Sequence, residues 1–285
     1  MPSSVKEQSY TLPDSGCKAQ VANLGSDLAV IVTHPWGPLG GNMNNNVVLA
    51  IVVWFQRLQI TTMRFDFSGH QIGKGHRQVQ QVKEAANFLL TGAHLDGSTS
   101  YSSHQQTASS TTTTSPHKRT KQPPRSILLV GYSYGSIISA SASIEIPQCI
   151  GVAMISPPLA VRHWLYLFHG NYHLEQARKS GLPLIMILGS RDNFTGEDAF
   201  MEVVQSMPTA TTTGAVLKDA DHFFRGREQD LMDVLGHWIL NVFPQCQGDL
   251  KKLCQAEFPS FAPPVLNNAG SGESFMGCGA FMPGE

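Results

Sequence analysis

Residues 126–140 read SILLVGYSYGSIISA, an apolar run followed by the pentapeptide GYSYG (131–135) and a run of small and apolar residues. This order predicts a strand, a sharp turn and a helix, with Ser133 at the apex of the turn. The glycines two residues before and after Ser133 leave room for a strained backbone at the apex. We therefore predict that Ser133 is a catalytic nucleophile and that the amide of Tyr134, at the helix N-terminus, stabilises an oxyanion. The alternative is a Gly-Ser loop that opens an ordinary helix.

The rest of the chain alternates short apolar runs with longer helical patterns, which is typical of an α/β fold with a mostly parallel central sheet flanked by helices. Several of the runs are apolar throughout, as in strands buried on both faces. Strands are expected at 28–32, 60–65, 127–130, 150–155, 184–188 and 214–217, with a weak edge strand at 18–22. Helices are expected at 45–58, 77–90, 135–143, 199–206 and 228–243.

The length of 285 residues suits one large domain, which we expect to span residues 18–244. Residues 97–125 are rich in Ser, Thr, Gln and Pro and nearly free of aliphatic side chains. Such a segment buries too little apolar surface to offset its ordering entropy, so we predict a disordered insertion there. The tail, 245–285, is rich in Gly and Pro and is expected to be loosely ordered.

A serine hydroxyl needs a general base within hydrogen-bond reach, itself oriented by a carboxylate. Where the nucleophile lies in a strand–turn–helix of this kind, the chain order is serine, acid, histidine, with the partners just after strands. Asp192 and His222 each follow a predicted strand in that order, and His222 is the one histidine of eleven that meets both conditions. They are the predicted acid and base. Asp192 has an alternative role in an Asx turn or helix cap, which would leave Glu197 or Asp198 as the acid.

The loop after the first long apolar strand, residues 33–43, reads THPWGPLGGNM. On such sheets this loop supplies the second oxyanion donor. Pro35 has no amide hydrogen, so the amide of Trp36 is the expected donor. His34 is expected to brace the loop rather than to perform acid–base chemistry.

Six motifs in this order, HP with GG (34–35, 40–41), RFDFSG (64–69), GYSYG (131–135), ISPP (155–158), GSRD (189–192) and DHFF (221–224), resemble those of compact α/β-hydrolases. The resemblance covers approximately residues 22–243, apart from the insertion. It implies an α/β-hydrolase fold in a single domain with a short cap segment. It also implies no cofactor, no metal, and hydrolysis of carboxylic esters or related acyl bonds through an acyl-enzyme.

The resemblance further implies which loops border the substrate. The candidate substrate contacts are His34, Gly37, Gly69, His70, Pro158 and Trp164. Residues 68–75, however, lack the Arg-Gly-x-Gly-x-Ser pattern of the family, so its substrate preferences do not carry over. Residues 160–181 are short and aromatic, which favours a small apolar lid over the site; plain packing of these aromatics on the sheet helices is the alternative.

The charge balance, a formal net charge of -1, gives no electrostatic reason to expect nucleic acid or an anionic membrane surface as a partner. No apolar run approaches the roughly 20 residues that span a bilayer, and the N-terminal residues carry no secretory signal pattern. The five cysteines are scattered and without metal-ligand spacing, which favours reduced thiols and a cytoplasmic location. The expected partner is a small-molecule acyl substrate, and the sequence does not fix the oligomeric state.

Two alternative functions are compatible with the same sequence features. One is a catalytically inactive binding or scaffold protein, because fold does not imply function. The other is an acyltransferase or peptidase that uses the same triad. Esterase, thioesterase and lipase activities are likewise not separated by the sequence.

Overall fold

The computed structural model describes residues 5–69, 73–95, 122–159, 169–243 and 266–268. The predicted insertion lies almost entirely outside the described residues, as does most of the predicted tail. Two of the candidate substrate contacts, His70 and Trp164, also lie outside them.

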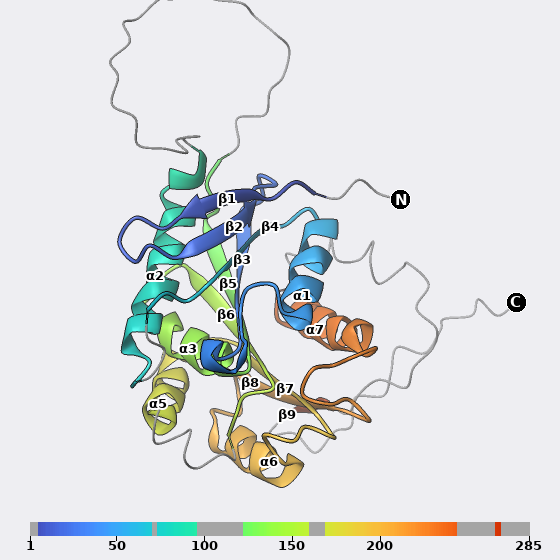
Figure 1. Cartoon of the computed structure of the whole chain (residues 1–285). Helices are drawn as coiled ribbons and strands as arrows, with labels where there is room; N and C mark the ends of the chain where they lie inside the picture. The colour runs from blue at the N-terminus through green and yellow to red at the C-terminus, as the bar shows by residue number, and fades with distance from the viewer. Residues whose placement is uncertain (1–4, 70–72, 96–121, 160–168, 244–265, 269–285) are drawn as a thin grey trace, which may run out of the picture.

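Within the described residues, nine strands form one sheet in the order β1-β2-β4-β3-β5-β6-β7-β8-β9 (Figure 1). The strands are β1 (Gln8–Thr11), β2 (Lys18–Ala22), β3 (Leu28–Thr33), β4 (Thr61–Phe65), β5 (Ser126–Tyr132), β6 (Cys149–Ile155), β7 (Leu184–Gly189), β8 (Thr212–Leu217) and β9 (Leu266–Asn268). The six strands from β4 to β8 in this order are parallel, whereas the pairs β1–β2, β2–β4 and β8–β9 are antiparallel. The predicted mostly parallel sheet is confirmed.

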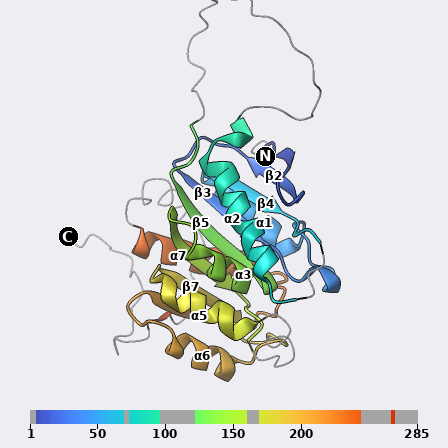
Figure 2. The ribbon, with the colours of Figure 1, turned by 90° about the vertical axis from the view of Figure 1, so that its left-hand side faces the viewer.

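Helices cover both faces of the sheet, and each face has its own buried apolar cluster (Figure 1). One face carries α1 (Asn46–Arg57) and α7 (Glu228–Val242). The other carries α2 (His76–Leu90), α3 (Tyr134–Ser143), α5 (Gly170–Ser180) and α6 (Glu197–Ser206), which Figure 2 turns toward the viewer. Short 3-10 turns occur at η1 (Gly37–Leu39) and η2 (Ala93–Leu95). Among the residues that the structure describes, none of these helices has the length and apolarity needed to cross a bilayer.

Every predicted strand and helix is present, with ends that differ by a residue or two. Of the described strands and α-helices, β1, α5 and β9 were not predicted. Both β1 and β9 pair with the sheet although they lie outside the range 18–244 expected for the domain. These two strands form the two edges of the sheet.

The strand order reverses between β3 and β5, because the chain passes from β3 to β4 on one side and returns to β5 on the other. Thr33 at the end of β3 lies beside Gly131 near the end of β5 in the parallel register. In open α/β sheets, ligands bind outside the carboxyl ends of the strands at such a switch point. The functional site is therefore expected in the loops that follow β3 and β5.

Candidate active site

The turn between β5 and α3 consists of one residue, Ser133. Its backbone angles, φ 53° and ψ -121°, lie in a region that L-residues rarely occupy. A Cβ on Gly135 would lie 2.6 Å from Thr33 Oγ1 and 2.7 Å from the carbonyl oxygen of His34. A Cβ on Gly131 would run into the backbone of Ser136. Both glycines are therefore required, one by the turn itself and the other by the loop after β3.

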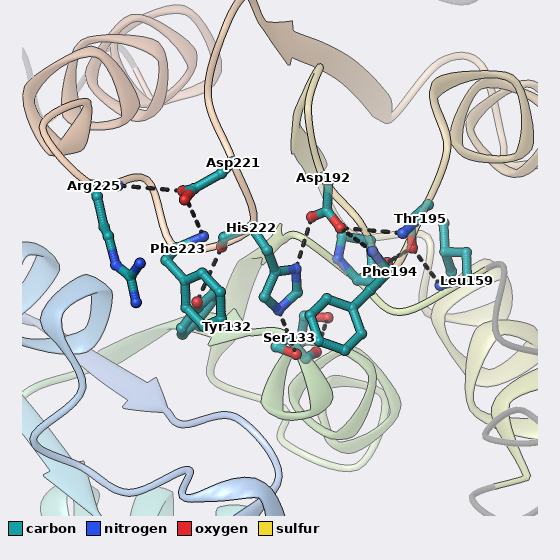
Figure 3. A network of polar contacts seen from close by, with 12 residues as sticks. Tyr132, Ser133, Leu159, Asp192, Phe194, Thr195, Asp221, His222, Phe223 and Arg225 are labelled. Atoms are coloured by element: carbon teal, nitrogen blue, oxygen red, sulfur yellow. Dashed lines mark hydrogen bonds and ion pairs between the residues drawn. The ribbon is translucent and has the colours of Figure 1, made fainter.

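The structure brings Ser133, His222 and Asp192 into one hydrogen-bonded chain at the carboxyl end of the sheet (Figure 3). Ser133 Oγ lies 3.1 Å from His222 Nε2, and His222 Nδ1 lies 2.8 Å from Asp192 Oδ2. A carboxylate only accepts hydrogen bonds, so the ring proton is on Nδ1 and Nε2 is left to accept the serine proton. The side chains of His222 and Asp192 are 4% and 0% exposed, which keeps water from competing for this contact.

The carboxylate of Asp192 makes the contacts required by both of the interpretations that the sequence left open. One carboxylate oxygen, Oδ1, accepts the amides of Phe194 at 2.8 Å and Thr195 at 3.1 Å, which is an Asx turn. The other oxygen, Oδ2, accepts from His222. The hydroxyl of Thr195 in turn donates to the Pro157 carbonyl, 2.7 Å away, and accepts the amide of Leu159. The turn thus fixes the direction in which the carboxylate faces the histidine.

The loop that carries His222 is held at two consecutive carbonyls by side chains from distant elements. Tyr132 donates its hydroxyl to the carbonyl of His222, at 3.0 Å, and Asn46 donates its amide to that of Phe223, at 2.7 Å. Within the loop, Asp221 accepts the amide of Phe223. Neither Tyr132 nor Asn46 was predicted from the sequence, in which the position of Tyr132 beside Ser133 is the one available signal.

Three aromatic rings surround the imidazole of His222. The ring centroid of Phe194 lies 4.4 Å from that of His222, and those of Phe223 and Tyr132 lie 5.4 Å and 5.6 Å away. Phe194 was also missed, because it follows Asp192 in a polar turn where nothing in the sequence marks it as a neighbour of His222. The arrangement limits the orientations open to the imidazole.

The loop after β3 packs against the nucleophile turn and is braced by His34, as predicted. His34 is 1% exposed, its Nδ1 lies 2.5 Å from the carbonyl oxygen of Pro35, and its Nε2 accepts the amide of Phe67 at 2.9 Å. Burial lowers the pKa of His34, which favours the neutral imidazole that this pattern requires. Both ring nitrogens are used inside the protein, so His34 has none left for the substrate contact also predicted for it.

The remaining predicted substrate contacts in the described chain lie in three loops near the sheet's carboxyl edge. Gly37 begins η1 and is half-buried. Gly69 follows β4 with φ 75°, and a Cβ there would lie 2.6 Å from the guanidinium of Arg77. Pro158 is buried beside the residues that Thr195 bridges. Contact of these three residues with a substrate stays a prediction.

The described part of the predicted cap, α5, packs on α3. Residues 160–168, which carry most of the aromatic side chains of the predicted lid, lie outside the described residues. Its His173 is buried, with Nδ1 2.8 Å from Ser141 Oγ and Nε2 2.7 Å from the carbonyl of Lys74. Both nitrogens are occupied, so His173 is not available as a metal ligand. Among the residues that the structure describes, no group of three or more His, Cys, Asp or Glu side chains is arranged to hold a metal ion.

Comparisons with known proteins agree with this architecture. No protein-family model matches the chain. It is 22% identical over 218 residues to an uncharacterised protein of Rickettsia prowazekii, covering 74% of this chain and 78% of the relative.

The solved structures that it resembles include an α/β serine hydrolase homologue from Coxiella burnetii, with a TM-score of 0.60, 18% identity, and 81% of this chain and 95% of the other covered. A second is an α/β serine hydrolase without a lid from Xanthomonas campestris, with a TM-score of 0.59, 18% identity, and 85% and 96% covered. A third is an esterase from Pyrococcus furiosus, with a TM-score of 0.59, 15% identity, and 83% and 92% covered. This chain therefore has the fold of these α/β-hydrolases.

Proposed function

We propose that this protein is a serine hydrolase that cleaves carboxylic esters through an acyl-enzyme. The observation that carries the proposal is the hydrogen-bonded chain from Ser133 Oγ through His222 to Asp192, with its distances of 3.1 Å and 2.8 Å. A nucleophile, a base and an orienting carboxylate within hydrogen-bond reach form the arrangement that activates a serine at neutral pH.

In the proposed mechanism, Ser133 Oγ attacks the ester carbonyl while His222 Nε2 accepts its proton. Asp192 stabilises the resulting imidazolium through Nδ1. The oxyanion of the tetrahedral intermediate accepts hydrogen bonds from the amides of Trp36 and Tyr134. His222 then protonates the leaving alcohol, and a water molecule activated by the same histidine releases the acyl group.

Two features support the amides of Trp36 and Tyr134 as oxyanion donors. Tyr134 is the first residue of α3, so its amide points out of a helix N-terminus next to Ser133. The loop that carries Trp36 is pressed against the same turn, since the carbonyl of His34 lies against Gly135. An oxyanion on a carbonyl attacked by Ser133 would form between these two segments.

The proposed substrate is a small-molecule ester. Structural neighbours of this chain include an esterase and a serine hydrolase without a lid, and these names favour an ester over other acyl compounds. We also propose a cytoplasmic location. The free thiols of Cys17 and Cys149, both buried, fit a reducing compartment.

Hydrolysis of p-nitrophenyl esters of graded acyl length by the purified protein tests the proposal. We expect turnover by the wild type and a loss of about 10⁴-fold or more in S133A. Ser143→Ala is the matched control, because Ser143 is a buried serine of the same helix whose hydroxyl donates to the carbonyl of Ala140 within that helix. Turnover that survives in S133A, or a folded wild type that cleaves none of the esters, would contradict the proposal and favour a binding protein of the same fold.

A further inference from the structure

The ring of Phe194 is a half-buried aromatic surface beside the proposed base. Its backbone is fixed, since its amide donates to Asp192 Oδ1 at 2.8 Å. The ring is tilted by 48° to the imidazole of His222, with 4.4 Å between centroids. Figure 3 draws Phe194 and Phe223 on opposite sides of His222, with Phe194 on the side of Asp192 and Thr195.

The chemistry of the proposed reaction brings the leaving group to this side chain. His222 Nε2 takes the proton of Ser133 and must deliver it to the leaving oxygen, which therefore comes within hydrogen-bond reach of Nε2. Substituents on that oxygen extend past the edge of the imidazole. A ring whose centroid is 4.4 Å from the imidazole is within van der Waals reach of them.

Phe223 does not offer an equivalent surface, although it also contacts His222. The guanidinium of Arg225 lies over its ring, with 4.7 Å from Cζ to the ring centroid. This cation covers a face of the ring that an apolar group would otherwise contact. The two phenylalanines therefore differ in what they present to a ligand.

We propose that Phe194 is a specificity-determining residue that forms one wall of the leaving-group subsite and favours esters of aromatic alcohols. The inference rests on the proposed hydrolase function. An aryl group on the alcohol packs against the half-exposed ring, removing apolar surface of both from water and adding ring–ring contact. A short alkyl group on the same oxygen leaves part of the ring in water.

Competing esters with the same acyl group isolate this effect. Benzyl acetate and propyl acetate share the acetyl group and an alkoxide leaving oxygen, and differ in the ring. The quantity measured is the ratio of kcat/KM for the benzyl ester to that for the propyl ester, because this ratio reports differential stabilisation of the two transition states. A mutation that merely disturbs His222 lowers kcat/KM for both esters by the same factor, so the ratio does not change.

We expect Phe194→Leu to lower the benzyl-to-propyl ratio by about two- to tenfold, the value of one aromatic contact. Phe194→Tyr keeps the ring and should keep the ratio, and it serves as the folded variant if the leucine variant is unstable. Phe223→Leu removes the other ring contact to His222 and should leave the ratio at the wild-type value.

A ratio unchanged in F194L, changed equally in F223L, or lost in F194Y would overturn the assignment. If the wild type cleaves both esters, such a result counts against the role of Phe194 alone. If the folded wild type cleaves the p-nitrophenyl esters but neither acetate, the subsite assignment alone is overturned. If it cleaves none of these esters, the proposed function fails and the subsite assignment falls with it.

Discussion

The hydroxyl of Tyr132 donates a hydrogen bond of 3.0 Å to the backbone carbonyl of His222, 90 residues further along the chain. Tyr132 is the last residue of β5 and immediately precedes Ser133. One strand end therefore holds the proposed nucleophile through the backbone and the proposed base through a side chain. Tyr132 is 1% exposed and His222 is 3% exposed, so bulk water does not readily replace this donor at the His222 carbonyl.

Removing the Tyr132 hydroxyl is expected to loosen His222 without removing any proposed catalytic group. In Tyr132→Phe the ring still packs, but a buried carbonyl loses its partner at a cost of about 1–3 kcal/mol. We expect kcat for ester hydrolysis to fall about tenfold with KM unchanged, as for a misplaced base. The low-field proton resonance of His222 Nδ1–H should shift or broaden.

A matched control for this variant is present elsewhere in the fold. Tyr10 also donates its hydroxyl to a histidine carbonyl, that of His94, at 2.6 Å, but it lies on β1 at the far edge of the sheet. Tyr10→Phe should lose stability yet keep the turnover and the His222 resonance. Equal kinetic losses in both variants would mean that Tyr132 acts only through global stability.

Replacing the carboxylate of Asp192 by an amide should separate its two roles. Asn at this position still accepts the amides of Phe194 and Thr195, so the turn and the melting temperature should be retained. An amide NH₂ facing His222 Nδ1 favours the tautomer with hydrogen on Nε2, which cannot accept the serine proton. We expect kcat to fall by about 10⁴-fold.

The control is Asp219→Asn, which breaks an exposed ion pair with Arg191 and should leave both kcat and stability nearly unchanged. An Asp192→Asn enzyme within tenfold of the wild type would exclude Asp192 as the acid.

The glycine after the nucleophile should be intolerant of a methyl group. In Gly135→Ala the new Cβ would lie 2.6 Å from Thr33 Oγ1, so the loop after β3 must move away from the turn. We expect a loss of about 1–3 kcal/mol in stability and a larger proportional loss of activity. Gly196→Ala is the control, because Gly196 has φ -72° and no atom within 4 Å of a Cβ. Melting curves and ester turnover of both variants test this; an active, stable G135A protein would contradict the described contact.

The buried His173 predicts a stability change at acidic pH. The pKa of His173 is lowered from 6.5 to about 4, mainly by burial and to a smaller extent by the nearby His76 and His169, while the hydrogen bond to the Lys74 carbonyl opposes the shift. The unfolded chain therefore binds a proton more readily than the folded protein between pH 6.5 and 4. Stability conferred by the neutral ring is complete above pH 6.5 and falls as the pH drops toward 4, by up to roughly 3 kcal/mol.

His173→Gln should flatten that dependence, because glutamine does not titrate and retains a donor for the carbonyl of Lys74. The measurement is the midpoint of thermal unfolding at several pH values across this window for both proteins. Parallel curves for the wild type and the variant would assign the acid sensitivity to other groups, of which the buried His34 is the first to examine.

The elements that the sequence predicted correctly are those with strong local patterns. The apolar strands β3 to β8 and the amphipathic helices carry periodicities that a short window contains. By contrast, β1 is four residues long and mostly exposed, so it has no apolar pattern and exists because its backbone pairs with β2. The helix α5 was missed because its surface is mainly polar and its buried contacts are with α3.

Some residues of the candidate site could likewise be predicted from local sequence patterns, and others could not. Ser133, Asp192 and His222 could be named because each follows a strand whose end the sequence reveals. Tyr132, Asn46 and Phe194 act through contacts with a loop that is 28 to 177 residues away in the chain. A local sequence pattern does not show which residues far apart in the chain come into contact. These three residues are therefore identified from the folded structure.

The most direct test of the central claim is covalent labelling of the wild-type protein by a fluorophosphonate probe, followed by mass spectrometry of the modified peptide. We expect a single adduct on Ser133 that is absent in S133A and forms much more slowly in a His222→Gln variant that melts at the wild-type temperature. A folded wild-type protein that remains unlabelled, or an adduct on another serine, would contradict the assignment of Ser133 as an activated nucleophile.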